Sequence, residues 1–187
     1  MSPAVRLEQR GDIALIFVDN PPVNASSAAV RQGIVAALEA IGGDVSGVVI
    51  VGAGKTFIAG SDIREFGQAL PPPELPEVLA AIEACPVPVI AALHGSALGG
   101  GYELALACDW RIATPDAVAG LPEVGLGMIP GAGGTQRLPR LVGLPKAIEI
   151  ITSARRVPAP EALDLGMIDA VAEDDLIADA IAFLAGK

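Results

Sequence analysis

The chain alternates between short, continuous apolar runs and segments with helical spacing. Ile13 to Val18, Val48 to Val51 and Val87 to Leu93 have the length and composition of buried strands. Between them, Ala28 to Ile41 carries apolar residues at helical spacing, and Glu77 to Ala84 reads as a second helix after a run of prolines. Because parallel strands need crossover connections, the alternation predicts an α/β fold with a mostly parallel sheet and helices packed against it.

The second half of the chain continues the same pattern without an internal repeat or a low-complexity linker. At 187 residues the whole chain, 1–187, is expected to form a single domain, since domains commonly have about 100 to 200 residues. The remaining expected elements are helices at Tyr102 to Cys108, Thr135 to Val142, Pro145 to Ser153, Pro160 to Leu165 and Asp175 to Leu184, and a strand at Met167 to Val171.

The composition excludes several classes of protein. Hydrophobic residues make up 52% of the chain and charged residues 18%, which excludes a disordered segment. The net charge of -10 argues against binding to nucleic acid or to an anionic membrane surface. No run approaches the roughly 20 apolar residues of a spanning helix, and the N-terminus lacks the order of a signal peptide. We therefore expect a soluble, cytoplasmic protein.

Cysteine and histidine are too sparse and too scattered for a metal centre. Cys85 and Cys108 follow no Cys-x-x-Cys pattern, and His94 is the single histidine of the chain. We expect no metal and no disulfide. Trp110 and Tyr102 are expected to be packing residues, although Tyr102 stands beside Glu103 and could touch a pocket there.

Ligands of parallel α/β sheets bind at the carboxyl ends of strands, so the loops after Val51, Leu93 and Ala113 are the first candidates for a site. The first of these loops, Gly52 to Thr56, resembles the end of a phosphate-binding P-loop. A P-loop requires a glycine five positions before Gly54, where this chain has Val49. The residues after Thr56 are also poor helix starters. A surface turn with an exposed lysine is the favoured interpretation.

Two acids stand alone among glycines and apolar residues. Glu103 follows the glycine run Gly99 to Gly101, which precedes a predicted helix, and Glu123 follows a Gly-Leu-Pro sequence. A helix N-terminus favours negative charge, and burial of an unpaired carboxylate is costly. Two carboxylates that converge can act as general acid and base. The spacing alone leaves open whether they meet or are two solvated acids at loop edges.

Taken together, five motifs in this order and spacing closely resemble the crotonase family, the enoyl-CoA hydratases and isomerases. The resemblance covers essentially the whole chain. The motifs are NPPVNA at Asn20 to Ala25, FIAGSDI at Phe57 to Ile63, HGSALGGGYEL at His94 to Leu104, Pro122-Glu123, and IPGAGGTQRL at Ile129 to Leu138.

The resemblance implies a fold of repeated ββα turns wound into a spiral, which binds an acyl-CoA thioester. By position, the thioester carbonyl would meet the backbone amides of Ser61 and Gly100, which form an oxyanion hole. Two glutamates hold the water in the hydratases of this family, and they correspond here to Glu103 and Glu123. The presence of both favours a 2-enoyl-CoA hydratase, with Glu123 transferring the proton at the α-carbon and Glu103 activating water. The same groups would serve Δ3,Δ2-enoyl-CoA isomerisation.

The same resemblance predicts where coenzyme A, the polyanionic part of the substrate, binds. No separate cofactor is expected. Lys55 and Arg64 are candidate phosphate partners, whereas Arg137, Arg140 and Lys146 are read as helix-surface charges. The predicted substrate-binding residues are Val23, Lys55, Ala59, Gly60, Asp62, Ile63, Arg64 and Gly99.

Length is the departure from the family pattern. Free-standing members continue with a helical segment that completes the acyl pocket and a trimer, so a homotrimer is in doubt for this chain. The motifs also resemble the hydratase part of bifunctional hydratase and 3-hydroxyacyl-CoA dehydrogenase enzymes of fatty-acid β-oxidation. A non-catalytic acyl-CoA-binding domain, or a truncated part of such an enzyme, is therefore the alternative hypothesis.

Overall fold

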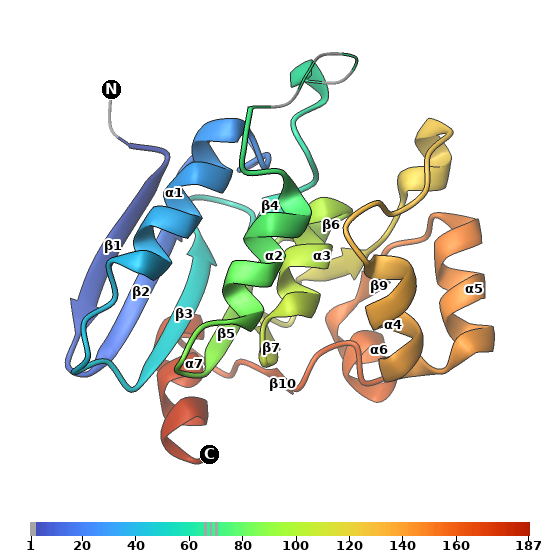
Figure 1. The fold of residues 1–187 in the computed structure, drawn as a ribbon. Helices are drawn as coiled ribbons and strands as arrows, with labels where there is room; N and C mark the ends of the chain where they lie inside the picture. Colours follow the sequence, from blue (N-terminus) through green and yellow to red (C-terminus); the bar gives the residue numbers. More distant parts are fainter. Residues whose placement is uncertain (1–2, 66, 68, 70) are drawn as a thin grey trace.

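The computed structural model describes residues 3–65, 67, 69 and 71–187, and it winds the chain into a spiral (Figure 1). Three successive turns each place one strand in a large sheet and the next strand in a small sheet. The large sheet consists, in spatial order, of β1 (Val5–Arg10), β2 (Ile13–Val18), β3 (Gly47–Gly52), β5 (Val89–Leu93), β7 (Trp110–Ala113) and β10 (Ala170–Val171). The small sheet consists of β4 (Ile58–Ala59), β6 (Ser96–Leu98), β8 (Val118–Gly120) and β9 (Val157–Pro158).

The large sheet is parallel from β2 to β10, which confirms the predicted α/β fold. The exception is β1, which pairs with β2 in an antiparallel hairpin. Sequence analysis missed β1 because Arg6, Glu8 and Arg10 alternate with other residues there. Every residue of β1 is half-buried or exposed, which suits charged side chains on an edge strand.

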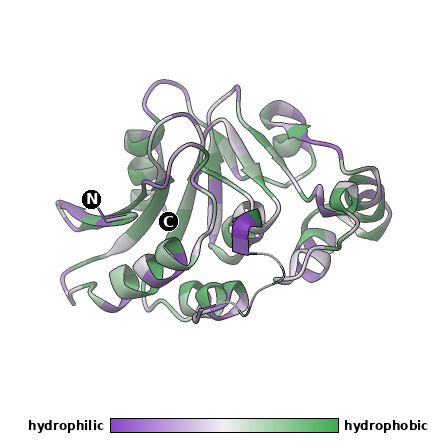
Figure 2. Ribbon diagram, turned by 90° about the horizontal axis from the view of Figure 1, so that it is seen from above, coloured by the Kyte–Doolittle hydropathy of each residue, from purple (hydrophilic) through white to green (hydrophobic). Residues whose placement is uncertain are grey.

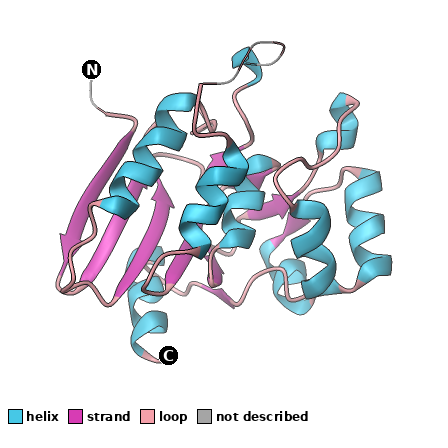
Figure 3. Cartoon of the chain, in the orientation of Figure 1, coloured by secondary structure: helices cyan, strands magenta, loops and turns pink. Residues whose placement is uncertain are grey.

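Helices cover both faces of the large sheet (Figures 1 and 3). Because successive side chains of a strand point to opposite faces, Ala14 and Ile16 of β2 belong to one core cluster and Ile13 and Leu15 to the other. The first cluster includes buried residues of three helices, α1 (Ala28–Glu39), α2 (Leu75–Glu83) and α3 (Gly100–Ala107). The second packs against α7 (Leu176–Ala185).

The remaining elements come after strands of the small sheet along the chain. They are the 3-10 turns η1 (Ile63–Glu65) and η2 (Glu123–Leu126), and the helices α4 (Gly134–Val142), α5 (Leu144–Ser153) and α6 (Ala159–Asp164). Gly143, at a φ of 78°, separates α4 from α5. Among the helices that the structure describes, none combines the length and the apolar character needed to cross a membrane.

The core is built mainly from aliphatic residues, and the sheet strands carry much of the hydrophobic sequence (Figure 2). Tyr102 is fully buried and donates its hydroxyl to the carbonyl oxygen of Met167 at 2.9 Å. Trp110 packs edge-on against Phe183, with ring centroids 5.9 Å apart. Both aromatic residues therefore serve packing, as the sequence predicts.

Candidate active site

The candidate site lies where three parallel strands of the small sheet end. Ala59 of β4 pairs with Leu98 of β6, and Leu98 pairs with Gly120 of β8. The segments that follow these three residues therefore emerge side by side at one edge of the sheet. Each loop that the sequence predicts after a large-sheet strand contains one strand of the small sheet. The site lies after that short strand and not directly after the large-sheet strand. Sequence analysis missed these strands because each has only two or three residues.

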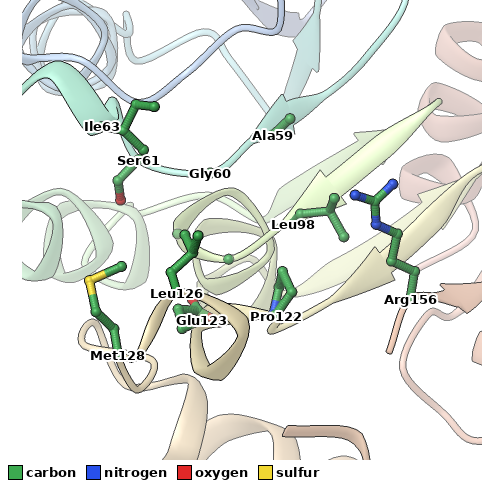
Figure 4. Close-up of a pocket in the computed structure, with 12 residues that line it drawn as sticks. Ala59, Gly60, Ser61, Ile63, Leu98, Pro122, Glu123, Leu126, Met128 and Arg156 are labelled. Carbon is green, nitrogen blue, oxygen red and sulfur yellow. The ribbon is translucent and has the colours of Figure 1, made fainter. Parts of the chain in front are cut away.

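A cavity of about 240 Å³ opens at this edge (Figure 4). Seven of the residues that line it were predicted from the sequence as site residues, and five were not. The predicted ones are Ala59, Gly60, Ser61, Ile63, Gly99, Gly100 and Glu123. The others are Leu98, Pro122, Leu126, Met128 and Arg156.

The backbone amides of Ser61 and Gly100 lie close together in this cavity. A Cβ atom placed on Gly100 would lie 2.9 Å from Ser61 Oγ and 3.8 Å from Ser61 N. Gly100 is the first residue of α3, and Gly99 before it has a φ of 54°, which glycine adopts readily. Within the described chain, neither amide donates to a protein acceptor. Both are thus free for a ligand, and the amide of Gly100 has the favourable end of the helix dipole.

Glu123 is the acid that lines the cavity. It begins η2 and is partly buried, and its Oε2 has no hydrogen-bond partner among the described residues. Burial, followed by the nearby charge of Glu103, raises the pKa of Glu123 to about 7. A carboxyl group with this pKa can both give and take a proton near neutral pH.

Glu103 belongs to α3 and is not among the residues that line the cavity, and only 2% of its surface is exposed. Its Oε1 accepts hydrogen bonds from the amides of Ala132 and Gly134, each at 2.8 Å. A Cβ atom on Gly134 would lie 3.0 Å from that oxygen, so this position needs the small residue. The glycine-rich loop thus holds the Glu103 carboxylate in place. The charge of Glu103 contributes to the raised pKa of Glu123, so the two acids are near enough to influence one another, a question that the spacing left open.

A second cavity, of about 390 Å³, adjoins the first and shares Ala59, Ser61 and Ile63 with it. It collects most of the predicted CoA-binding residues. Its lining consists of Asn20, Pro21, Pro22, Val23, Ala25, Ala59, Ser61, Asp62, Ile63 and Arg64. Gly60 and Gly99 line the first cavity instead.

The two predicted phosphate partners are placed differently. Arg64 reaches solvent, with 78% of its side chain exposed, and donates to the buried carboxylate of Asp62 at 2.6 Å. This hydrogen bond holds the pKa of Asp62 below its usual value. Lys55 is exposed on the turn after β3 and lines neither cavity. That turn leads into β4 and not into a helix, so the P-loop interpretation is wrong.

Arg31 is a site-supporting residue that sequence analysis missed. It is buried in α1 and donates to the carbonyl oxygen of Ser26 at 2.9 Å and to Glu65 Oε2 at 2.8 Å. It also donates to the carbonyl oxygens of Pro71 and Pro73. Since the amide of Ser26 donates to the carbonyl of Gly60, Arg31 anchors the segment that presents Ser61. The feature of the sequence that could have pointed to Arg31 is its position as a charged residue on the otherwise apolar face of a predicted helix.

The other singled-out residues lie outside the first cavity. Burial lowers the pKa of His94, and its Nδ1 is buried without a hydrogen-bond partner in the described chain. Arg137 pairs with Glu83, and Lys146 pairs with Glu149.

Fold and site together define an α/β spiral protein with a ligand-sized cavity, two unpaired backbone amides and a coupled pair of glutamates. A family model described as Enoyl-CoA hydratase/isomerase matches residues 8–186. The chain belongs to the enoyl-CoA hydratase/isomerase family, which confirms the resemblance read from its motifs.

Curated relatives include single enzymes and part of a larger one. The chain is 44% identical to a probable enoyl-CoA hydratase of Bacillus subtilis, covering 87% of this chain and 67% of the relative. It is 54% identical to the peroxisomal bifunctional enzyme of Danio rerio over 91% of this chain, and it spans only 24% of that relative.

Solved structures show the same fold. An enoyl-CoA hydratase from Bacillus anthracis superposes with a TM-score of 0.91 at 36% identity, covering 98% of this chain and 76% of that one. DspI of Pseudomonas aeruginosa superposes with a TM-score of 0.91 at 33% identity, covering 99% of this chain and 74% of that one. These likenesses confirm the predicted crotonase-type spiral.

Proposed function

We propose that this chain is a hydratase that adds water across the double bond of a 2-enoyl-CoA thioester. The observation that carries the proposal is the coupled pair Glu103 and Glu123 beside the free amides of Ser61 and Gly100. Members of the family act on acyl-CoA thioesters, and the relatives of this chain include a probable enoyl-CoA hydratase of Bacillus subtilis and an enoyl-CoA hydratase of Bacillus anthracis. The two adjoining cavities give room for a substrate with a CoA part and an acyl part.

In the proposed complex, CoA lies along the second cavity, beside Val23, Asp62 and Arg64, and the thioester carbonyl reaches the amides of Ser61 and Gly100. Addition of water to the β-carbon places negative charge on the carbonyl oxygen as an enolate forms. Two preorganised N–H donors stabilise that charge, and loss of one such donor typically costs about 10² to 10³ in rate.

The two glutamates then divide the proton transfers. Glu103, held by two backbone amides, accepts a proton from the attacking water, whose oxygen bonds to the β-carbon. Glu123 carries a proton near neutral pH and delivers it to the α-carbon, so the enolate returns to the thioester. One proton is gained and one lost by the pair, and the reaction needs no cofactor beyond the CoA of the substrate.

Isomerisation of a 3-enoyl-CoA is a second candidate activity, and the raised pKa of Glu123 favours it. Near pH 7 a substantial fraction of Glu123 is ionised and can take the α-proton of the substrate. The same amides would stabilise the resulting dienolate. A role in fatty-acid β-oxidation fits both activities. The trimer and the cytoplasmic location stay predictions.

The test follows the loss of conjugated enoyl-thioester absorbance with purified protein and crotonyl-CoA, beside the Glu123→Gln variant. Turnover that this substitution abolishes, in a variant that still folds and binds crotonyl-CoA, is the expected result. Well-folded protein that binds CoA without turnover would overturn the proposal and favour the non-catalytic acyl-CoA-binding alternative.

A further inference from the structure

Arg137 of α4 is bound to the loop that holds the Glu103 carboxylate. Its Nη1 donates to the carbonyl oxygen of Ala132 at 2.9 Å. The amide of Ala132, together with that of Gly134, donates to Glu103 Oε1. Ala132 therefore joins the two charged side chains, because its carbonyl binds the guanidinium and its amide binds the carboxylate.

The same guanidinium also connects the loop to a second helix. Its Nε and Nη2 donate to Glu83 Oε1 at 2.9 Å and 2.7 Å, and Glu83 is the last residue of α2. Both α2 and α4 pack against α3, the helix that carries Glu103 (Figure 1). Every nitrogen of the Arg137 side chain thus has an acceptor, and the planar guanidinium is fixed between α2 and the loop.

The backbone of the loop leaves room for this side chain. Gly133 has a φ of 98°, which favours glycine, and a Cβ atom there would lie 2.3 Å from Arg137 Nη1. An open groove of about 460 Å³ is lined by Gly131, Ala132 and Gly133, and Gly131 is exposed. Because the loop is open to solvent on that side, the bond from Arg137 to Ala132 contributes directly to its conformation.

We propose that Arg137 is a positioning residue for Glu103, because it holds the loop whose amides orient the carboxylate toward the attacking water. It has this role only if the proposed hydratase function holds, in which Glu103 accepts a proton from water. A general base must lie within hydrogen-bond reach of that proton, and a misplacement of about 1 Å can cost about 10²-fold in rate. An ion pair near the surface adds little to stability, so loss of Arg137 should change the rate more than the folding.

The kinetic test compares Arg137→Gln with the matched control Arg140→Gln. Arg140 lies three residues further along α4, is exposed, and has no hydrogen bond or ion pair with another described residue. Both substitutions thus remove one positive charge from the same helix. We expect Arg137→Gln to lower kcat for crotonyl-CoA hydration about ten- to hundredfold, with KM changing less. Isomerisation of 3-hexenoyl-CoA, which uses no water, should change far less, and Arg140→Gln should leave both activities at the wild-type level. Arg137→Lys keeps a charged donor and should recover part of the loss.

Amide hydrogen exchange followed by NMR tests the hold on the loop without any turnover. In wild type the amides of Ala132 and Gly134 should exchange slowly, since Glu103 accepts from both. Arg137→Gln should speed their exchange about tenfold or more, as expected when a hydrogen bond that supports them is lost. Arg140→Gln should leave these rates unchanged. The amides of β3 report whether each variant keeps its global stability.

Faster exchange at Ala132 and Gly134, with hydration lowered more than isomerisation, supports the positioning role. Unchanged exchange at both amides in Arg137→Gln overturns it, whether or not the wild type hydrates crotonyl-CoA. Wild-type kcat in the folded fraction of Arg137→Gln, or an equal loss of hydration in Arg140→Gln, also overturns it. Absence of turnover in folded wild type contradicts the proposed function instead, and the exchange rates then still decide whether Arg137 holds the loop of Glu103.

Discussion

Glu103 raises the pKa of Glu123 although the two acids belong to different elements, α3 and η2. The first and larger cause is burial of Glu123, and together they bring this pKa from 4.5 to about 7. The raised pKa means that Glu123 keeps its proton in the folded protein at pH values where a solvated glutamate has lost it. An acid that stays protonated up to neutral pH beside one held by two amide donors is suited to giving a proton.

This relationship predicts the pH dependence of hydration. The active form carries one proton on the pair, so kcat/KM for crotonyl-CoA should fall as the pH rises above about 7, where Glu123 loses its proton. The fall should approach tenfold for each pH unit. Because hydration releases no net proton, dehydration of 3-hydroxybutyryl-CoA should fall in the same way. Initial rates between pH 5 and pH 9 check this, and a profile that stays level to pH 9 would contradict the assignment of Glu123 as proton donor.

Replacing Glu103 should separate hydration from isomerisation. Glu103→Gln removes the group that accepts the proton of water, so we expect kcat for crotonyl-CoA hydration to fall about 10² to 10⁴-fold. Isomerisation of 3-hexenoyl-CoA uses no water and should be affected far less. The loss of the negative charge should also lower the pKa of Glu123 and move the ascending limb of the isomerase pH profile, where Glu123 becomes ionised, to lower pH. Equal losses in both activities would show that Glu103 does not act on water.

Gly100 tests the proposed pair of amide donors. Gly100→Ala would place a Cβ atom 2.8 Å from Leu75 Cδ2 and 2.9 Å from Ser61 Oγ, so the side chains of Leu75 and Ser61 must move. The amide N–H remains in this variant, but the added methyl group crowds the space beside Ser61, so we expect kcat for crotonyl-CoA to fall, by at most the roughly 10² to 10³-fold of one lost oxyanion donor. Gly43→Ala is the matched control, because a Cβ atom there meets nothing within 4 Å. Wild-type activity in Gly100→Ala would contradict the placement of the thioester carbonyl in the space between this residue and Ser61.

The sequence predicts the parts of the fold that have a clear periodicity. The large-sheet strands β2, β3 and β5 are continuous apolar runs, and α1 carries apolar residues at helical spacing, so local pattern is enough to find them. The strands of the small sheet have two or three residues and lie within glycine-rich loops, where no period can develop.

The site likewise has residues that a local pattern identifies and contacts that depend on how distant segments pack. Glu103 and Glu123 stand out as acids in apolar surroundings, yet their coupling depends on how α3 and η2 pack, which spacing does not contain. Arg156 reaches the cavity because β9 pairs with β8, and that pairing joins segments far apart in the sequence. Arg31 needs the path of the segment after Ser61 to be known before its role can be seen.

Arg31 is expected to act as a positioning residue for Ser61. Its hydrogen bonds to Glu65 and to three backbone carbonyls tie α1 to the segment between Ser61 and α2. Arg31→Met removes all of them and leaves Oε2 of Glu65 and the carbonyl oxygens without this donor, so we expect the free energy of unfolding to fall by about 3 to 5 kcal/mol. Denaturant unfolding followed by circular dichroism measures this loss.

A positioning role must also change kinetics in protein that remains folded. Glu65→Gln keeps the shape of the side chain and an acceptor for Arg31 but removes the charge, so most of the stability should remain. We expect kcat for crotonyl-CoA to fall several-fold in this variant, with KM changing less, because the amide of Ser61 acts on the developing enolate. Arg31→Lys should recover part of the activity lost in Arg31→Met. Unchanged kcat in Glu65→Gln, together with destabilised Arg31→Met protein whose folded fraction is fully active, would reduce Arg31 to a purely structural residue.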